Sequence, residues 1–101
     1  MHKLLVLYPK PADVAAFMTY YVERHLPLAL DLPGLRSNRY YRPEMLSPGD
    51  SVFLIWEGVF DSTEAMFLAL KSEAGKKVAR DVPNYSPAGA TMLHFGLDGG
   101  A

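Results

Sequence analysis

The sequence predicts an α+β domain in which four strands form an antiparallel sheet and helical segments connect them in the order βαββαβ. Short apolar or alternating runs at residues 4–8, 35–42, 51–60 and 90–97 have the length of strands. Between them, residues 12–31 and 61–74 repeat apolar side chains at steps of three and four, as an amphipathic helix does. Proline and glycine separate the segments.

The first and third strands are apolar on both faces. Along residues 4–8, Leu5 and Leu7 alternate with Leu4, Val6 and Tyr8. Residues 51–60 repeat this pattern, with Glu57 as the single acid within an otherwise apolar run. A strand of this kind is covered on both sides, which predicts central positions in the sheet. The last strand, residues 90–97, is also largely apolar, whereas residues 98–101 predict a frayed tail.

The first helix carries one apolar stripe, formed by Val14, Phe17, Met18, Tyr21, His25 and Leu28. Asp13 fits its first turn, where a carboxylate meets the positive end of the helix dipole. Pro27 has no amide hydrogen, so we expect the helix to kink or restart there. Pro33 and Gly34 then end it before a polar strand at residues 35–42, which predicts an edge strand or one wall of a polar cavity.

The second helix begins after residues 51–60. Asp61 is its expected N-cap, with Glu64 reaching back to complete a capping box. Gly75 is expected to break this helix, and residues 76–81 to form one or two further turns. Residues 82–87 contain two prolines and are predicted to be a loop.

The strand pattern creates an imbalance of burial. This element order resembles the ferredoxin-like fold, in which helices cover one face of an antiparallel sheet. Most of the strands here are apolar on both faces, and the chain has no further element to cover the second one. A second copy of the chain is the simplest cover, which predicts two sheets packed face to face as a dimeric α/β barrel.

Composition limits the possible functions. A chain of 101 residues predicts one domain, residues 1–101. Its formal net charge of −1 favours neither nucleic acid nor an anionic membrane as a partner. There is no cysteine, hence no disulfide or thiolate metal site. The apolar run at residues 4–7 is too short for a signal peptide or a membrane span, so we expect a cytoplasmic protein.

Several segments together resemble the EthD-like branch of the dimeric α/β barrel proteins. The resemblance extends from Lys3 to Phe95 in the family's order, and the His-x-Pro element followed by Pro-Gly-Leu is its most specific part. The segments are KLLVLYP at 3–9, the tyrosine pair at 20–21, HLPLA at 25–29, LPGL at 32–35, FDS at 60–62 and DVPNY at 81–85.

This resemblance implies a homodimer that receives a small organic molecule in the barrel interior or in a cleft beside it. The wider relatives include lactone isomerases, aromatic polyketide cyclases, dehydratases and cofactor-free monooxygenases. Where a histidine acts at the position of His25, it acts as a general base, so the resemblance implies that role for His25. Relatives that also use a cysteine cannot be followed, because this chain has none.

The residues themselves give His25 two interpretations. Imidazole titrates near neutral pH, as a general base should, but His25 could equally bond a backbone carbonyl freed by Pro27 and fix the kink. Further candidates for ligand binding are Asn38, Tyr40, Trp56, Glu57 and His94. Tyr40 and Trp56 offer a ring and a donor each, Asn38 could hold a substrate oxygen, and Glu57 could orient His25 or pair with an arginine of a neighbouring strand.

The favoured function is therefore a cofactor-independent enzyme that acts on an aromatic, lactone or polyketide-like molecule. His25 would remove a proton beside a carbonyl, and tyrosine or asparagine donors would stabilise the enolate. The alternatives are a non-catalytic binding protein with the same pocket and a haem-binding barrel. The spacing of the histidines predicts no metal site, and no sequence motif predicts another cofactor.

Overall fold

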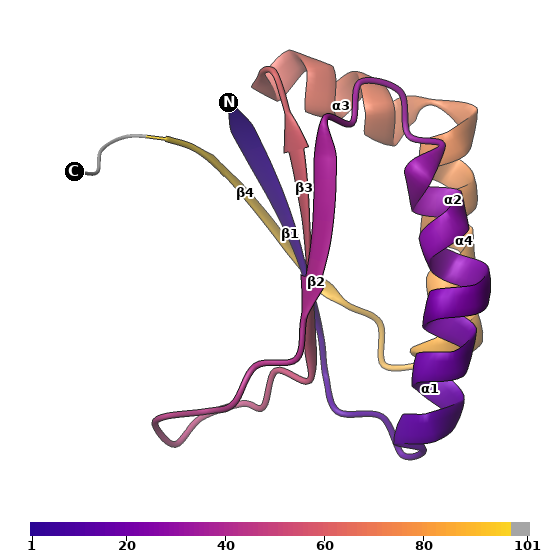
Figure 1. Ribbon diagram of the computed structural model, residues 1–101, viewed down its shortest axis with the longest axis vertical. Helices are drawn as coiled ribbons and strands as arrows, with labels where there is room; N and C mark the ends of the chain where they lie inside the picture. Colours follow the sequence, from indigo (N-terminus) through magenta and orange to yellow (C-terminus); the bar gives the residue numbers. More distant parts are fainter. Residues whose placement is uncertain (98–101) are drawn as a thin grey trace.

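The sheet has the strand order β2-β3-β1-β4, and each neighbouring pair is antiparallel (Figure 1). The computed structural model of the chain describes residues 1–97, so the predicted tail at 98–101 lies outside the described residues. The strands are β1 (His2–Tyr8), β2 (Ser37–Tyr41), β3 (Leu54–Phe60) and β4 (Thr91–Gly96). The predicted βαββαβ order and the central positions of the first and third strands are confirmed.

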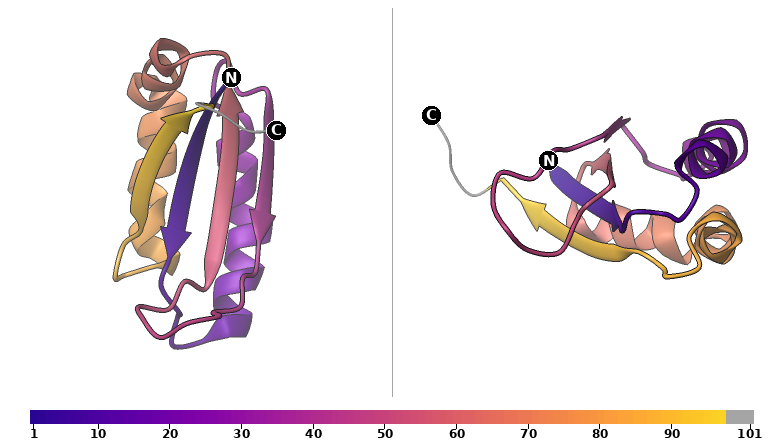
Figure 2. Two further views of the ribbon diagram at one scale, coloured as in Figure 1. Left: turned by 90° about the vertical axis from the view of Figure 1, so that its left-hand side faces the viewer. Right: turned by 90° about the horizontal axis from the view of Figure 1, so that it is seen from below.

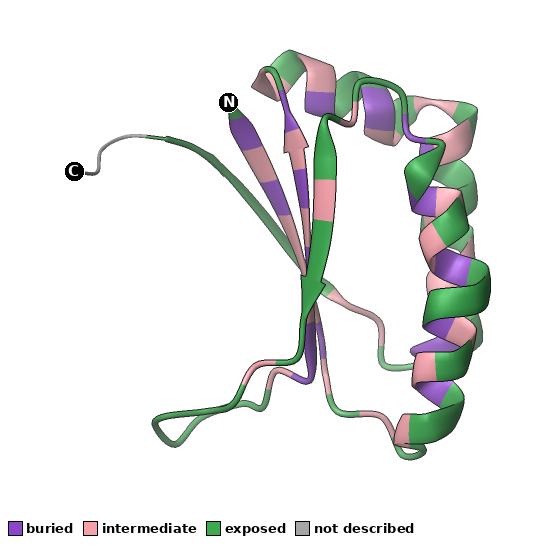
Figure 3. Ribbon diagram, in the orientation of Figure 1, coloured by how far each residue is buried: buried purple, intermediate pink, exposed green. Residues whose placement is uncertain are grey.

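The helices lie on one face of this sheet (Figure 2). On that face Leu4, Tyr8, Leu54, Trp56 and Phe60 are buried, and they form the core together with the inner side of the helices (Figure 3). No helix of the described chain covers the other face. It presents an apolar surface formed by Leu5, Leu7, Ile55, Val59, Leu93 and Phe95.

The first helical column runs without a break through α1 (Val14–Tyr20), η1 (Tyr21–His25) and α2 (Leu26–Leu30). Asp13 caps it, accepting a hydrogen bond from the amide of Ala16 at 3.0 Å. The predicted restart at Pro27 is confirmed, because α2 begins at Leu26 with Pro27 in its first turn. The preceding segment η1 is a π-helical turn in which the Leu26 amide bonds the carbonyl of Tyr21. The wider turn supplies room for the proline ring, and such turns are frequent at functional sites.

The second column differs more from the sequence prediction. Ser62, not Asp61, caps α3 (Thr63–Lys71), since its hydroxyl accepts from the Ala65 amide at 3.1 Å. The Asp61 carboxylate is taken by the guanidinium of Arg36 on the chain that enters β2. An ion pair between distant residues thus displaces the expected cap by one position.

The break between α3 and α4 (Glu73–Tyr85) falls at Ser72, whose hydroxyl caps α4 by accepting from the amide of Gly75 at 3.1 Å. Gly75 therefore lies inside the helix and does not break it. The predicted loop at residues 82–87 is also wrong, because α4 continues through Pro83 to Tyr85. Pro83 is tolerated near the helix end, where the Ser86 amide still bonds the carbonyl of Val82. No helix of residues 1–97 has both the length and the apolarity needed to cross a bilayer.

Gly75 gives a test of this packing. A Cβ at this position would lie 2.4 Å from the carbonyl oxygens of Ala69 and Leu70, which are backbone atoms that cannot rotate away. Alanine normally stabilises a helix relative to glycine, but here we expect Gly75→Ala to lower the free energy of unfolding by about 1–3 kcal/mol. Denaturant titration measures the change.

Gly96→Ala is the matched control, because its Cβ would meet only the His2 side chain at an ordinary 3.6 Å. It should leave stability nearly unchanged. A Gly75→Ala protein as stable as the wild type would contradict the close contact between α3 and α4.

Candidate functional site

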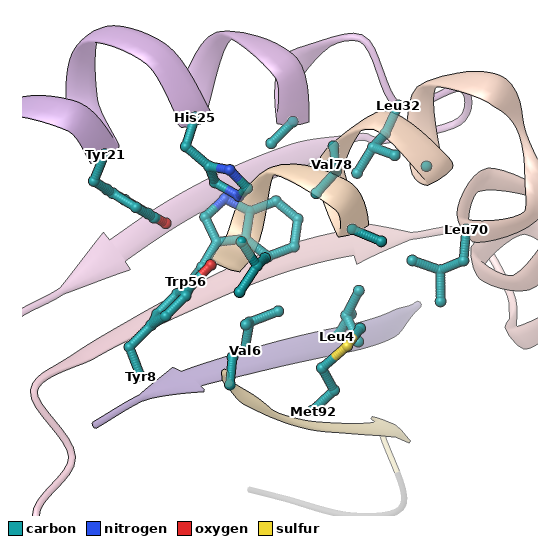
Figure 4. Close-up of a pocket in the computed structure, with 15 residues that line it drawn as sticks. Leu4, Val6, Tyr8, Tyr21, His25, Leu32, Trp56, Leu70, Val78 and Met92 are labelled. Atoms are coloured by element: carbon teal, nitrogen blue, oxygen red, sulfur yellow. The ribbon is translucent and has the colours of Figure 1, made fainter. Parts of the chain in front are cut away.

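A cavity of about 230 Å³ lies between the helix-covered face of the sheet and the two helical columns (Figure 4). Its sheet side is formed by Leu4, Val6, Tyr8, Trp56 and Met92, and most of the rest is formed by residues of η1, α2, α3 and α4. Its walls are mainly apolar. Within the described chain no lysine, arginine, aspartate or glutamate lines it, and His25 is its one readily titratable side chain.

His25 stands in this wall because η1 turns it inward. The residue is buried, and its Nδ1 lies 2.9 Å from Oδ2 of Asp81 on α4. Since an ionised carboxylate can only accept, Nδ1 carries the hydrogen and donates it to Asp81. Nε2 then holds the lone pair, and no hydrogen bond within residues 1–97 engages it. The imidazole thus presents a basic nitrogen at the wall of an apolar cavity.

Asp81 is itself held by several donors. The Tyr20 hydroxyl donates to Oδ1 at 2.6 Å, and the Asn84 amide donates to the same oxygen at 3.0 Å. Partial burial acts to raise the pKa of Asp81, but the bonds from Tyr20, His25 and Asn84 outweigh it, so the pKa lies below its ordinary value. Asp81 therefore stays ionised at neutral pH and keeps His25 in one tautomer.

The charge state of His25 follows from two opposing effects. Burial lowers the pKa of His25, while the hydrogen bond and the negative charge of Asp81 raise it. Burial prevails, and the pKa lies below its ordinary value of 6.5. At neutral pH His25 is consequently neutral and able to accept a proton, and Asp81 is placed to stabilise the cation that forms.

Tyrosine rings fix the imidazole from the side. The ring of Tyr85 lies 4.6 Å from that of His25, and its hydroxyl is 2.7 Å from the hydroxyl of Tyr8 on β1. Burial raises the pKa of Tyr8 to about 12, so its phenol remains protonated at neutral pH. This pair joins α4 to the sheet beside the cavity.

Glycine at position 58 shapes the opposite wall. A Cβ there would lie 2.3 Å from the Trp56 ring, so only glycine lets the indole lie across the neighbouring strand position. The indole Nε1 donates to Oδ1 of Asn38 on β2 at 3.3 Å. Gly58 and Asn38 together hold the largest ring of the cavity wall in place.

The residues predicted from sequence are thus unequally placed. His25 and Trp56 line the cavity. Asn38 and Tyr40 on β2 do not line the cavity but contact residues that do. Asn38 accepts a hydrogen bond from Trp56, and Tyr40 lies edge-on to the Tyr21 ring. His94 lies near the other end of β1, with its Nδ1 2.8 Å from Nε2 of His2.

Glu57 is on the opposite face of the sheet from the cavity. It bonds Lys3 of the neighbouring β1 at 3.3 Å and Tyr41 at 3.4 Å, and not an arginine as expected. It therefore does not orient His25, because Asp81 does.

Asp81 falls at the end of the helical turns expected at residues 76–81, so no helical repeat beyond it indicated that it faces His25. On a helix, Asp81, Asn84 and Tyr85 are three and four positions apart and share one face. The spacing was visible in the sequence, but Pro83 concealed that the helix continues.

The EthD domain family matches residues 9–87, which include the long helix, His25 and Asp81. The chain belongs to the EthD family. This EthD chain is 30% identical over 94 residues to an uncharacterised 11.0 kDa protein of the thcB–thcC intergenic region in Rhodococcus erythropolis, covering 92% of this chain and 91% of that one. It also resembles the crystal structure of an EthD family protein from Bacillus halodurans, with a TM-score of 0.86, 30% identity and coverage of 96% and 98%.

More distant structures share the fold alone. A dimeric ferredoxin-like protein of unknown function from Thermobifida fusca gives a TM-score of 0.72 at 10% identity, covering 95% of this chain and 90% of that one. The cofactor-independent oxygenase SnoaB of Streptomyces nogalater gives 0.70 at 14% identity, with coverage of 98% and 94%. The predicted ferredoxin-like architecture is thereby confirmed.

The haem-binding alternative does not fit this site. A haem needs room for its macrocycle and cationic partners for its propionates, whereas the cavity holds about 230 Å³ and no lysine or arginine of the described chain lines it. Among residues 1–97 there is also no group of three or more histidine, aspartate or glutamate side chains that could hold a metal ion.

The lowered pKa of His25 predicts how stability depends on pH. Between the folded pKa and 6.5 the folded chain binds fewer protons than the unfolded chain at this residue. The contribution of neutral His25 is therefore complete above 6.5 and is lost as the pH falls below it. We expect His25→Gln, which can still donate to Asp81 but cannot titrate, to lose less stability than the wild type between about pH 7.5 and about pH 5.5.

Urea titrations at the two pH values measure this difference. If the wild type and His25→Gln lose the same free energy of unfolding on acidification, His25 is not held neutral by its surroundings.

Proposed function

We propose that this EthD protein is a cofactor-independent enzyme that moves a proton at a carbon beside a carbonyl group, with His25 as the general base. One observation carries the proposal: His25 lines an apolar cavity, its Nδ1 is fixed by Asp81, and no hydrogen bond of the described chain engages its Nε2. The supporting comparison is the cofactor-independent oxygenase that shares the fold.

The chemical step needs only groups of this chain. Nε2 of His25 takes the proton, the carbon–hydrogen bond breaks, and its electron pair moves into the enolate, leaving the negative charge on the carbonyl oxygen. Asp81 keeps the hydrogen bond to Nδ1 and stabilises the imidazolium that results. Return of the proton to the same carbon gives exchange, and return to another carbon gives an isomerisation. In a cyclisation the enolate carbon bonds to a second carbonyl carbon of the same molecule, whose oxygen takes the proton from the imidazolium. In a dehydration the enolate expels a hydroxyl group from the neighbouring carbon, and the imidazolium protonates that group so that it leaves as water.

The substrate that suits the cavity is a small, hydrophobic organic molecule. Trp56 supplies a flat apolar wall, and Asn38 fixes its ring from behind. Tyr40 supports Tyr21 from the β2 side. Direct ligand contact by Asn38 or Tyr40 would require a molecule that extends from the cavity toward β2.

Proton abstraction can be tested without knowing the natural substrate. The ketone 2-indanone is hydrophobic, compact and enolisable, and exchange of its α-protons in D₂O can be followed by NMR. We expect the wild type to accelerate exchange and His25→Gln to lose about 10²-fold or more of that acceleration. Asp81→Asn should lie between them, because the base remains while its orientation and charge partner are lost.

His94→Gln is the matched control, since His94 does not line the cavity. It should exchange 2-indanone at the wild-type rate. If a folded His25→Gln protein exchanges 2-indanone as fast as the wild type, the proposal is refuted. If the wild type binds the ketone but does not accelerate exchange, the protein is a non-catalytic binding protein.

The same proposal includes a homodimer. The uncovered sheet face carries six apolar side chains, and the ferredoxin-like protein from Thermobifida fusca that shares the fold is dimeric. A second copy packed face to face would bury this surface and complete a barrel.

Charge placed on that face should disrupt the dimer. Phe95 on β4 is 42% exposed in the single chain, so Phe95→Glu can fold but cannot pack against a second apolar sheet. We expect sedimentation to show a dimer for the wild type and a monomer for Phe95→Glu.

The control is Phe67→Glu on α3, where the phenylalanine is equally exposed at 41% but lies on the helix side. This variant should remain dimeric. A monomeric wild type, or a dimeric Phe95→Glu protein, would exclude this interface.

A further inference from the structure

Tyr21 has the one buried side-chain polar atom in residues 1–97 that lacks a hydrogen-bond partner. The residue is completely buried, and its ring packs against the rings of Phe17, Tyr8 and Tyr85. The hydroxyls of Tyr8 and Tyr85 form a hydrogen bond with each other, and neither of them bonds the hydroxyl of Tyr21. A buried hydroxyl without a partner is unfavourable and rare in folded proteins, which indicates a role other than stability.

The position of Tyr21 connects it with His25. Both belong to the π-helical turn η1, four residues apart, and both line the cavity. Their rings lie 5.6 Å apart at an angle of 26°, so they project side by side from the same face of the turn. In Figure 4 both side chains reach from the helix toward the sheet, and the Tyr21 hydroxyl is turned toward the side of Tyr8 and Trp56. A hydrogen-bond donor and a base thus stand next to each other in one wall.

The protonation states fix what each group can do. Burial raises the pKa of Tyr21 far above its ordinary value of 10.0, so the hydroxyl keeps its proton and can donate it in a hydrogen bond. His25 is neutral, and no lysine or arginine of the described chain lines the cavity. A carboxylate or phosphate ligand would therefore lose its hydration without gaining a cation. A pure hydrocarbon would leave the Tyr21 hydroxyl without a partner.

We infer that the Tyr21 hydroxyl recognises a carbonyl oxygen of the ligand, and that the ligands of this cavity are uncharged hydrophobic carbonyl compounds. The inference rests on the proposed function for its catalytic part. When Nε2 of His25 removes the α-proton, the charge that develops on the carbonyl oxygen is stabilised by the Tyr21 hydroxyl, which donates without transferring its proton. A donor of this kind lowers the barrier because it gains strength as the oxygen becomes negative.

Trp56 makes the inference measurable, since it is the only tryptophan of the chain and lies in the cavity wall. Quenching of its fluorescence gives the Kd of three probes of similar size: 2-indanone, indane and indane-2-carboxylate. We expect the wild type to bind 2-indanone about 3- to 10-fold more tightly than indane, and to bind the carboxylate more weakly than either. Tyr21→Phe should bind 2-indanone and indane equally well.

A stability measurement separates this role from a structural one. Tyr21→Phe removes a hydroxyl without a partner, so the unliganded variant should be at least as stable as the wild type. The matched variant Tyr85→Phe leaves the buried hydroxyl of Tyr8 unpaired and should be less stable. If Tyr21→Phe destabilises the protein as Tyr85→Phe does and still prefers the ketone to the hydrocarbon, the inference is wrong.

The exchange assay distinguishes failure of this inference from failure of the proposed function. If His25→Gln abolishes exchange while Tyr21→Phe retains both wild-type exchange and ketone preference, the base is correct and Tyr21 is not the donor. If no protein accelerates exchange but Tyr21→Phe loses the ketone preference, Tyr21 recognises the ligand of a binding protein and the enzymatic proposal fails.

Discussion

The hydrogen bond between Nδ1 of His25 and Asp81 is the interaction on which the site depends. It joins the long helical column to α4, two segments that are 56 positions apart in the chain. Without this bond, a neutral histidine in an apolar wall could adopt either tautomer. Asp81, itself held by Tyr20 and Asn84, keeps the hydrogen on Nδ1 and leaves Nε2 for the cavity. The hydrogen bonds among Tyr20, His25, Asp81 and Asn84 thus determine which ring nitrogen of His25 carries the lone pair.

The sheet sets the other constraint. Its helix-covered face forms the floor of the cavity, while the opposite face carries apolar side chains that the described chain leaves uncovered. In the proposed function the two faces have separate tasks, ligand binding on one and association on the other. Packing a second sheet against the outer face would make the floor rigid without occupying the cavity. A domain of about one hundred residues has a small core, and association of this kind is a usual source of additional stability.

Much of this arrangement could be predicted from the sequence, because it depends on local periodicity. The two-sided apolar strands at β1 and β3 fixed the central positions, and the stripe from Val14 to Leu28 placed His25 on the inner side of its helix. The rest depends on contacts between distant residues. Pro27 lies in the first turn of α2, where a missing amide hydrogen costs little, and Pro83 lies inside α4 near its end, so neither proline ends its helix as a loop. The expected loop at residues 82–87 removed the helical repeat that puts Asp81 on the face toward His25, so the expected partner of His25 was Glu57, which lies on the other face of the sheet.

The tautomer of His25 is the most direct measure of this account. Long-range ¹H–¹⁵N correlation spectra of the uniformly labelled protein at neutral pH distinguish the two ring nitrogens, and His25→Gln assigns the signals. The account predicts a neutral imidazole with its hydrogen on Nδ1 and an unprotonated Nε2. A hydrogen on Nε2, or an imidazolium at neutral pH, would contradict it, because the nitrogen that faces the cavity would then have no lone pair to accept a proton.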